Sequence, residues 1–185
     1  MTLLVIVCVL LFATTAAVTD ILSHKIYNWT TYPGILVALA VHAGTDLSVD
    51  GWSSDFAGLE DSLKGFFLCG LLMLVCFVFF GVGGGDVKLM AMLGAFLGVD
   101  RGLEALLWTL VLGAALGLAT LIWRVGLWKL ISGVVRHVFW CLRLANWLPL
   151  SDAERQALQP PLFLAPSALA ATVIVCFGWQ RYLSF

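Results

Sequence analysis

The sequence predicts an all-α, polytopic membrane protein: a helix bundle of six transmembrane helices plus one amphipathic helix at the membrane interface. Three observations predict this fold class. Hydrophobic residues make up 62% of the 185 residues and charged residues only 11%, and the mean hydropathy is +1.02. A soluble domain carries about 25% charged residues, so this chain has too little polar surface to cover a water-soluble globule. Apolar runs approaching the length of a membrane helix also recur along the whole chain.

The charge balance and the cysteines exclude several other classes of protein. The formal net charge is −1, so no basic field points to nucleic acid. Five cysteines, at positions 8, 69, 76, 141 and 176, form no CxxC pair and are expected to be buried thiols. His42 is expected to be a hydrogen-bonded histidine near a helix end. We therefore expect no metal and no cofactor, and a single membrane-embedded domain over residues 1–185.

Six apolar runs are expected to cross the membrane, at residues 3–19, 33–43, 63–82, 87–99, 103–123 and 162–179. The first run lacks the basic residues of a cleaved signal peptide, which favours a retained helix. The second helix is expected to begin near Thr30, with Pro33 in its first turn, where a missing N–H does no harm. The second and fourth runs are short, which indicates tilting, packing inside the bundle or local bilayer thinning.

The distribution of Lys and Arg predicts the orientation of the chain. With the N-terminus outside, the inner segments 20–31, 81–88 and 124–160 hold seven of these residues and the outer segments hold three. This bias fits the positive-inside rule. The first outer loop is expected to be acidic; its acids are Asp46, Asp50, Asp55, Glu60 and Asp61.

Residues 128–148 form the basic amphipathic segment. Lys129, Arg136 and Arg143 recur there at helical spacing on one stripe, and apolar residues lie mostly elsewhere. We expect this helix to lie in the headgroup region. The alternative, a seventh span, is costly because it would bury three cations.

Two aspartates stand at ends of predicted spans. Asp20 closes the first span, where a carboxylate opposes the helix macrodipole, and Asp86 opens the fourth. Asp86 also reads as a plain N-cap for a helix beginning at Val87. Gly83, Gly84 and Gly85 lie just before it; they permit positive φ and leave room for another chain, such as a peptide substrate, beside the carboxylate. By the predicted topology, both aspartates lie at the inner membrane face.

Two opposed carboxyl groups predict aspartic protease chemistry. One carboxylate takes a proton from water, while the other, protonated, hydrogen-bonds the scissile carbonyl. Asp86, at a helix N-terminus, is expected to ionise more readily, and Asp20 to keep its proton longer. Coupled titration can blur this assignment.

These residues resemble the type IV prepilin peptidases, a family of GxGD-type aspartic membrane proteases. The run Gly83-Gly84-Gly85-Asp86 matches GxGD, and Val87-Lys88-Leu89 continues it as D-x-K-L. Asp20 matches the first family aspartate, which closes a helix before a short polar loop. Tyr27 stands where the family commonly has proline. The proline- and alanine-rich run 160–166 is similar to the start of the family's last helix. The resemblance is strongest over 16–98 and weak over 124–160.

The resemblance implies an aspartic endopeptidase that removes the leader peptide of type IV prepilins or pseudopilins at the cytoplasmic face of the bacterial inner membrane. The chain begins directly with the first span and has no CxxC motif, so it looks like the short, peptidase-only form associated with tight-adherence (Flp) pili. The expected partners are a prepilin or pseudopilin peptide and the lipid bilayer. A homodimer is left open.

Three polar residues near the aspartates have two interpretations each. Lys88 either biases the charge of Asp86 or meets the substrate backbone, or else it is a positive-inside anchor. Lys25, with His24, either contacts the acidic residue found early in many mature pilins or is ordinary inner-loop charge. Asn28 either hydrogen-bonds the loop backbone or starts the next helix.

Two other functions compete with this interpretation. Presenilin-type and signal-peptide-peptidase-type proteases also use GxGD, but they place Tyr beside the first aspartate, where this chain has Thr19 and Ile21. A small transporter or pilus-assembly subunit would use the two acids to carry protons or cations. Such a carrier needs its acids near the bilayer midplane, whereas Asp20 and Asp86 are expected at one face.

Overall fold

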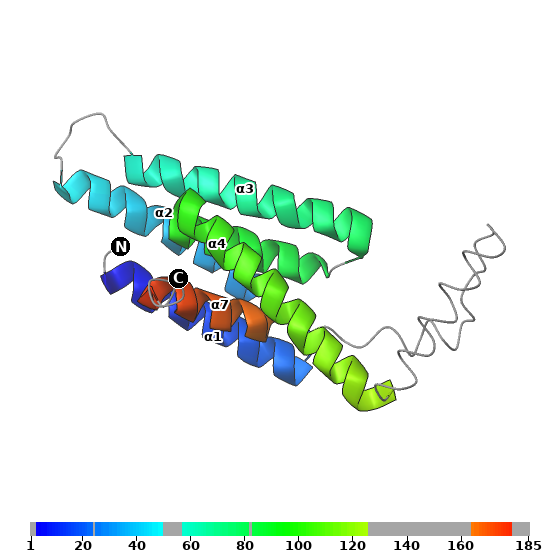
Figure 1. Cartoon of the computed structure of the whole chain (residues 1–185). Helices are drawn as coiled ribbons and strands as arrows, with labels where there is room; N and C mark the ends of the chain where they lie inside the picture. Colours follow the sequence, from blue (N-terminus) through cyan, green and yellow to red (C-terminus); the bar gives the residue numbers. More distant parts are fainter. Residues whose placement is uncertain (1–2, 24, 50–56, 82, 126–163, 179–185) are drawn as a thin grey trace. The chain divides into compact units, whose positions relative to one another are not determined.

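The computed structural model describes residues 3–23, 25–49, 57–81, 83–125 and 164–178, and within these ranges it is all-helical. The helices are α1 (Leu3–Ser23), α2 (Asn28–Val49), α3 (Ala57–Phe80), α4 (Gly84–Val125) and α7 (Leu164–Phe177) (Figure 1). The all-α prediction is therefore confirmed for the described residues.

The chain divides into two compact units, one of residues 1–112 with 163–185 and one of residues 113–162. Of the second unit, the structure describes residues 113–125, which are the last turns of α4. That all 185 residues form one domain stays a prediction. The basic amphipathic segment 128–148 and the prolines at 160 and 161 lie outside the described residues.

Three of the described helices are long and apolar enough to cross a membrane: Leu3–Ser23, Ala57–Phe79 and Gly84–Trp123. The helix Leu164–Phe177 is apolar but shorter. Helix α2 occupies the position of the second predicted span. The protein thus has the helices of a membrane bundle, while the number of six crossings stays a prediction.

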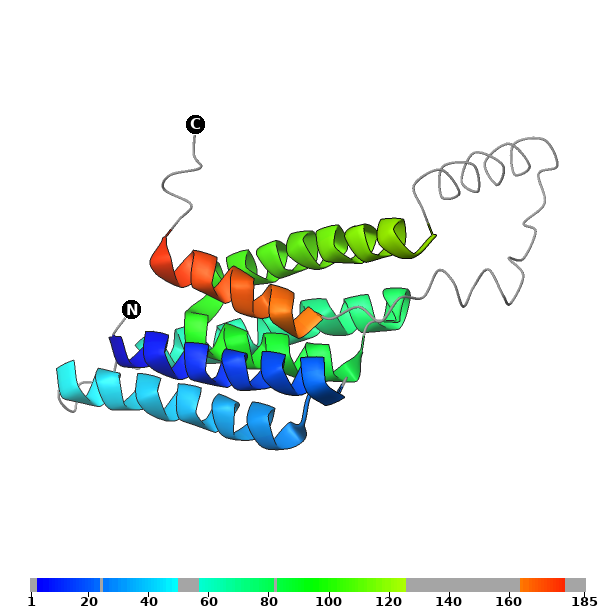
Figure 2. The same cartoon turned by 90° about the horizontal axis from the view of Figure 1, so that it is seen from below.

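Helix α4 reverses direction at Gly98 (Figures 1 and 2). Gly98 has φ 77° and ψ −169°, a backbone conformation that glycine adopts without steric cost. A β-carbon added to Gly102 would lie 3.1 Å from the Cα of Gly94, although eight residues of straight helix span about 12 Å. The two arms of α4, residues 84–97 and 99–125, therefore match the separate fourth and fifth runs of the sequence.

Acidic side chains cap helices at the end of the bundle where α4 reverses direction. Asp61 accepts a hydrogen bond from the backbone N–H of Val99 at 3.2 Å, where the second arm of α4 begins. Asp46 accepts one from Leu59 N–H at 2.9 Å and so caps α3. The prediction that Asp46, Glu60 and Asp61 lie in an acidic loop was wrong, because α2 and α3 extend far enough to include them.

Helix α2 begins earlier than the sequence predicted. Its first residue is Asn28, because the Tyr27 carbonyl accepts hydrogen bonds from Thr30 N–H at 3.0 Å and Thr31 N–H at 3.5 Å. Pro33 therefore lies in the second turn and not in the first. The prediction of a start near Thr30 was wrong by about half a turn.

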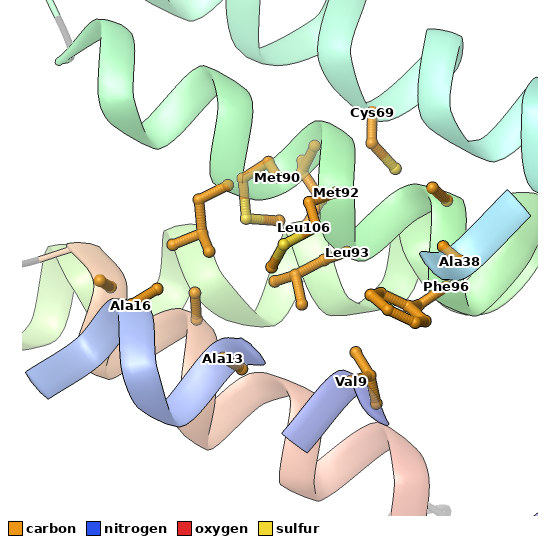
Figure 3. Close-up of a cluster of buried hydrophobic side chains, with 14 of the residues drawn as sticks. Val9, Ala13, Ala16, Ala38, Cys69, Met90, Met92, Leu93, Phe96 and Leu106 are labelled. Carbon is orange, nitrogen blue, oxygen red and sulfur yellow. The ribbon is translucent and has the colours of Figure 1, made fainter. Parts of the chain in front are cut away.

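The first arm of α4 is the centre of the core. Eight of its residues between Leu89 and Leu97 are at most 7% exposed, and a helix that is apolar and buried on all sides belongs inside a bundle. Packing inside the bundle thus accounts for this short run. Side chains of α1, α2, α3 and α4 meet around it (Figure 3); those labelled are Val9, Ala13, Ala16, Ala38, Cys69, Met90, Met92, Leu93, Phe96 and Leu106.

Small residues let the helices approach closely. Gly65 of α3 and Gly94 of α4 face each other, and a β-carbon on either would collide with the backbone carbonyl of the other. Ser62 of α3 donates a buried hydrogen bond to the Ala95 carbonyl at 2.6 Å. Such contacts between small and hydroxyl-bearing residues are typical of helix packing in membranes.

Replacing Gly65 with alanine is expected to destabilise the bundle by about 1–3 kcal/mol, because the added β-carbon meets backbone atoms that cannot rotate away. The matched control is Gly44→Ala in α2, where a β-carbon has no neighbour within 4 Å. That change is expected to leave stability unchanged or to raise it by about 0.5–1 kcal/mol. Thermal unfolding in detergent measures both, and equal unfolding temperatures would contradict the close crossing of α3 and α4.

Candidate active site

Asp20 lies in the last turn of α1. The helix continues to Ser23, so Asp20 does not end it, and the predicted end of the first span at Thr19 was one turn too early. The side chain is 8% exposed, although carboxylates are rarely so buried without a reason. The carboxyl group nevertheless lies at the C-terminal end of a helix, where it opposes the macrodipole as the sequence predicted.

Asp86 lies in the first turn of α4. The helix begins at Gly84 and not at Val87, so the alternative that Asp86 is a plain N-cap was wrong. The Gly83 carbonyl accepts hydrogen bonds from Asp86 N–H at 3.0 Å and Val87 N–H at 3.4 Å. In return, the backbone N–H of Gly83 donates to the Asp86 carboxylate. This reciprocal arrangement resembles a capping box and orients the carboxylate.

The structure brings Asp20 and Asp86 together. The last turn of α1 and the first turn of α4 lie at the same end of the bundle (Figures 1 and 2). The charge on Asp20 acts directly on the half-buried Asp86 carboxyl. Two carboxyl groups that are distant in sequence thus interact across two helix ends, which is the arrangement that shared-proton chemistry needs.

The glycines before Asp86 were expected to permit positive φ and the close approach of another chain. Gly83, Gly84 and Gly85 do not have positive φ. In the segment that joins α3 to α4, the glycine with positive φ is Gly81, at 68°. A β-carbon on Gly85 would lie 3.0 Å from the Cβ of Ile26. The chain that closely approaches this segment in the structure is therefore the protein's own loop between α1 and α2. A β-carbon on Gly83 would lie 3.0 Å from Oδ2 of Asp86.

Lys88 and Asn28 contact each other. The Lys88 ammonium donates a hydrogen bond to Oδ1 of Asn28 at 2.8 Å, and it lies 5.4 Å from the centroid of the Tyr32 ring. Asn28 starts α2, as one of its two interpretations predicted. Lys25 is exposed in the loop, and His24 lies outside the described residues.

Sequence reasoning did not identify Ile26 or Tyr32 as part of this region. Tyr32 lies one helical turn after Asn28 and so faces the same side of α2, a signal that the periodicity contains. Ile26 gave no such signal, because an isolated apolar residue in a polar loop does not reveal its contact.

The opposite end of the bundle holds a pocket of about 360 Å³, lined in part by His42, Asp61, Asp100 and Arg101. His42 is hydrogen-bonded within its helix, with Nδ1 2.9 Å from the Ala38 carbonyl, as expected from the sequence. Within the described ranges, no three His, Cys, Asp or Glu residues are grouped to hold a metal ion.

One of the comparisons with known proteins found a match. The model of the type IV leader peptidase family matches residues 5–118, a range that includes Asp20 and Asp86. No curated protein and no solved structure matches the chain. Because the matched range covers more than half of the 185 residues, the chain belongs to the type IV leader peptidase family and is a peptidase.

Proposed function

We propose that this protein is an aspartic endopeptidase that removes the leader peptide from type IV prepilins or pseudopilins, with Asp20 and Asp86 as the catalytic pair. The observation that carries the proposal is that the last turn of α1, which holds Asp20, and the first turn of α4, which holds Asp86, lie at the same end of the bundle, where the charge of Asp20 reaches Asp86. Membership of a peptidase family supplies the reaction class.

The surroundings of the two carboxyl groups support a shared proton. The Asp86 carboxylate accepts a hydrogen bond from the Gly83 N–H at the N-terminus of α4, and Asp20 is buried at the same end of the bundle. Two carboxyl groups held close together share one proton, because like charges at short range cannot both ionise. The ionised member accepts a proton from the attacking water, and the protonated member hydrogen-bonds the scissile carbonyl and then gives its proton to the leaving amine.

The position of the pair favours cleavage at a membrane face. Both aspartates lie within one turn of a helix end and not in the middle of a long helix. A carrier would place its acids near the midplane, so this position favours the peptidase over the transporter. The seven-to-three bias of Lys and Arg supports six crossings with the N-terminus outside and the pair on the cytoplasmic side of the inner membrane.

Co-expression with a candidate prepilin from the same organism tests the proposal. We expect the prepilin to lose its leader only when this protein is present, and mass spectrometry of the product to place the cut at the junction between the basic leader and the hydrophobic segment. The matched control is the same prepilin expressed with an empty vector. An unshortened prepilin beside a correctly inserted protein, tested over all prepilins and pseudopilins of that organism, would contradict the proposal.

A further inference from the structure

The Lys88 ammonium links the first turns of α2 and α4. It donates to Oδ1 of Asn28, the first residue of α2, at 2.8 Å. It also lies 5.4 Å from the ring centroid of Tyr32, one turn further along α2, within the range of a cation–π interaction. Two different groups of α2 therefore hold the Lys88 cation, which belongs to α4.

A second contact, on the other side of Asp86, joins α4 to the loop between α1 and α2. Ile26 packs so closely on Gly85 that a β-carbon there would lie 3.0 Å from the Ile26 Cβ and 3.5 Å from its Cγ1. Residues 25–27 join α1, which carries Asp20, to α2. The loop and the first residue of α2 thus contact α4 on both sides of Asp86, at Gly85 through Ile26 and at Lys88 through Asn28.

The direction of the Lys88 side chain separates it from Asp86. Residues two apart on a helix do not face each other. Among the residues that the structure describes, Lys64 forms a salt bridge with Glu60, whereas no salt bridge joins Lys88 to Asp86. To act as the counter-ion of Asp86, the Lys88 ammonium would have to turn toward it. Here it is engaged by Asn28 and Tyr32 instead.

We propose that Lys88 and Asn28 form a clamp that holds the α1–α2 loop against the start of α4 and thereby sets the position of Asp20 relative to Asp86. The proposal rests on the proposed function, since it assigns positioning roles within the same site. Lys88 and Asn28 act through the aspartates and not on the substrate. The clamp matters because an error of about 1 Å between reacting groups costs about 100-fold in rate.

A double-mutant cycle in the prepilin cleavage assay tests the clamp. Asn28→Leu removes the acceptor and Lys88→Met removes the donor at nearly constant size. Each is expected to lower kcat about tenfold, with KM unchanged, because a hydrogen bond to a charged group is lost. The double variant should fall no further than either single one, since both break the same contact. Lys88→Arg and Asn28→Asp keep a donor and an acceptor and should recover most of the rate.

Three controls distinguish the clamp from other roles of Lys88. Lys64→Met makes the same substitution at an exposed lysine in the second turn of α3 and should leave kcat unchanged. A pH–rate profile that shifts in Lys88→Met but not in Asn28→Leu would show that Lys88 acts on the charge of Asp86, and would overturn the clamp. A raised KM at constant kcat, which would mean substrate binding, or losses that multiply in the double variant would overturn it equally.

Thermal unfolding in detergent provides a readout that needs no substrate. It is measured on wild type, Asn28→Leu, Lys88→Met and the double variant. The clamp predicts that Asn28→Leu and Lys88→Met destabilise the bundle non-additively. If wild type cleaves no prepilin, the proposed function fails while this coupling still stands. If the two changes are additive in unfolding, the clamp fails even where cleavage is normal.

Discussion

Replacing either Asp20 or Asp86 with asparagine is expected to lower the rate of prepilin cleavage by about 10²–10⁴-fold, the contribution of a positioned acid or base. Asparagine keeps the size and the hydrogen-bonding oxygen of the carboxylate but neither ionises nor carries the shared proton. At position 86, that oxygen still accepts from the Gly83 N–H, so the first turn of α4 is preserved. The loss should therefore reflect chemistry and not folding.

Stability measurements separate chemistry from misfolding in these variants. Each substitution removes one of two interacting acids, so thermal unfolding temperatures in detergent should be equal to or higher than that of wild type. Asp100→Asn, at an exposed acid on the opposite end of the bundle, is the matched control and should cleave normally. Full cleavage by Asp86→Asn would exclude the paired-aspartate mechanism. Loss of ion flux in both variants without any effect on cleavage would favour the carrier.

Replacing Gly85 with valine is expected to lower the cleavage rate by about 100-fold, through misplacement of the two aspartates. A β-carbon at this position already lies 3.0 Å from the Ile26 Cβ, so the two branches of valine force the loop and the start of α4 apart. Asp20 precedes this loop and Asp86 directly follows Gly85, so the separation acts on the catalytic pair itself. The rate is measured in the same co-expression assay.

Gly84→Val is the matched control, because the nearest group to a β-carbon at Gly84 is the edge of the Phe77 ring at 3.9 Å. It should retain much more activity than Gly85→Val at equal levels of inserted protein. Adding Ile26→Gly to Gly85→Val removes the obstructing side chain and should restore part of the rate. If the two glycine variants cleave equally, or if Ile26→Gly gives no rescue, the contact between the loop and Gly85 does not position the site.

The helices could be predicted because their signal is local. An apolar run must form a helix in a bilayer, since its backbone groups otherwise have no hydrogen-bond partner. The positions of the six apolar runs thus anticipated α1, α2, α3, both arms of α4 and α7. The ends were less well predicted: α2 starts at the Tyr27 carbonyl and α1 extends past Asp20 because capping and solvation, not hydropathy, decide where a helix ends.

The candidate aspartates could also be found in the sequence, because a carboxylate at the end of an apolar run is costly and needs an explanation. Their proximity could not be derived from local pattern. It depends on how the other helices pack around the buried first arm of α4, through contacts such as that of Gly65 in α3 with Gly94 and that of Gly34 in α2 with Met92. The neighbour of Gly85 could not be predicted for the same reason, since the group beside it is Ile26, from another part of the chain.

The amino-acid sequence was sufficient to predict a helical membrane bundle with two acids at helix ends and a glycine-rich turn before one of them. These features follow from composition and from short-range spacing, which act over one or two helical turns. The packing of the helices was needed to establish that the charge of Asp20 reaches Asp86, that Lys88 is held by Asn28 and Tyr32, and that α4 folds back at Gly98. Each of these depends on close packing between segments, which is set by the shapes of many side chains at once.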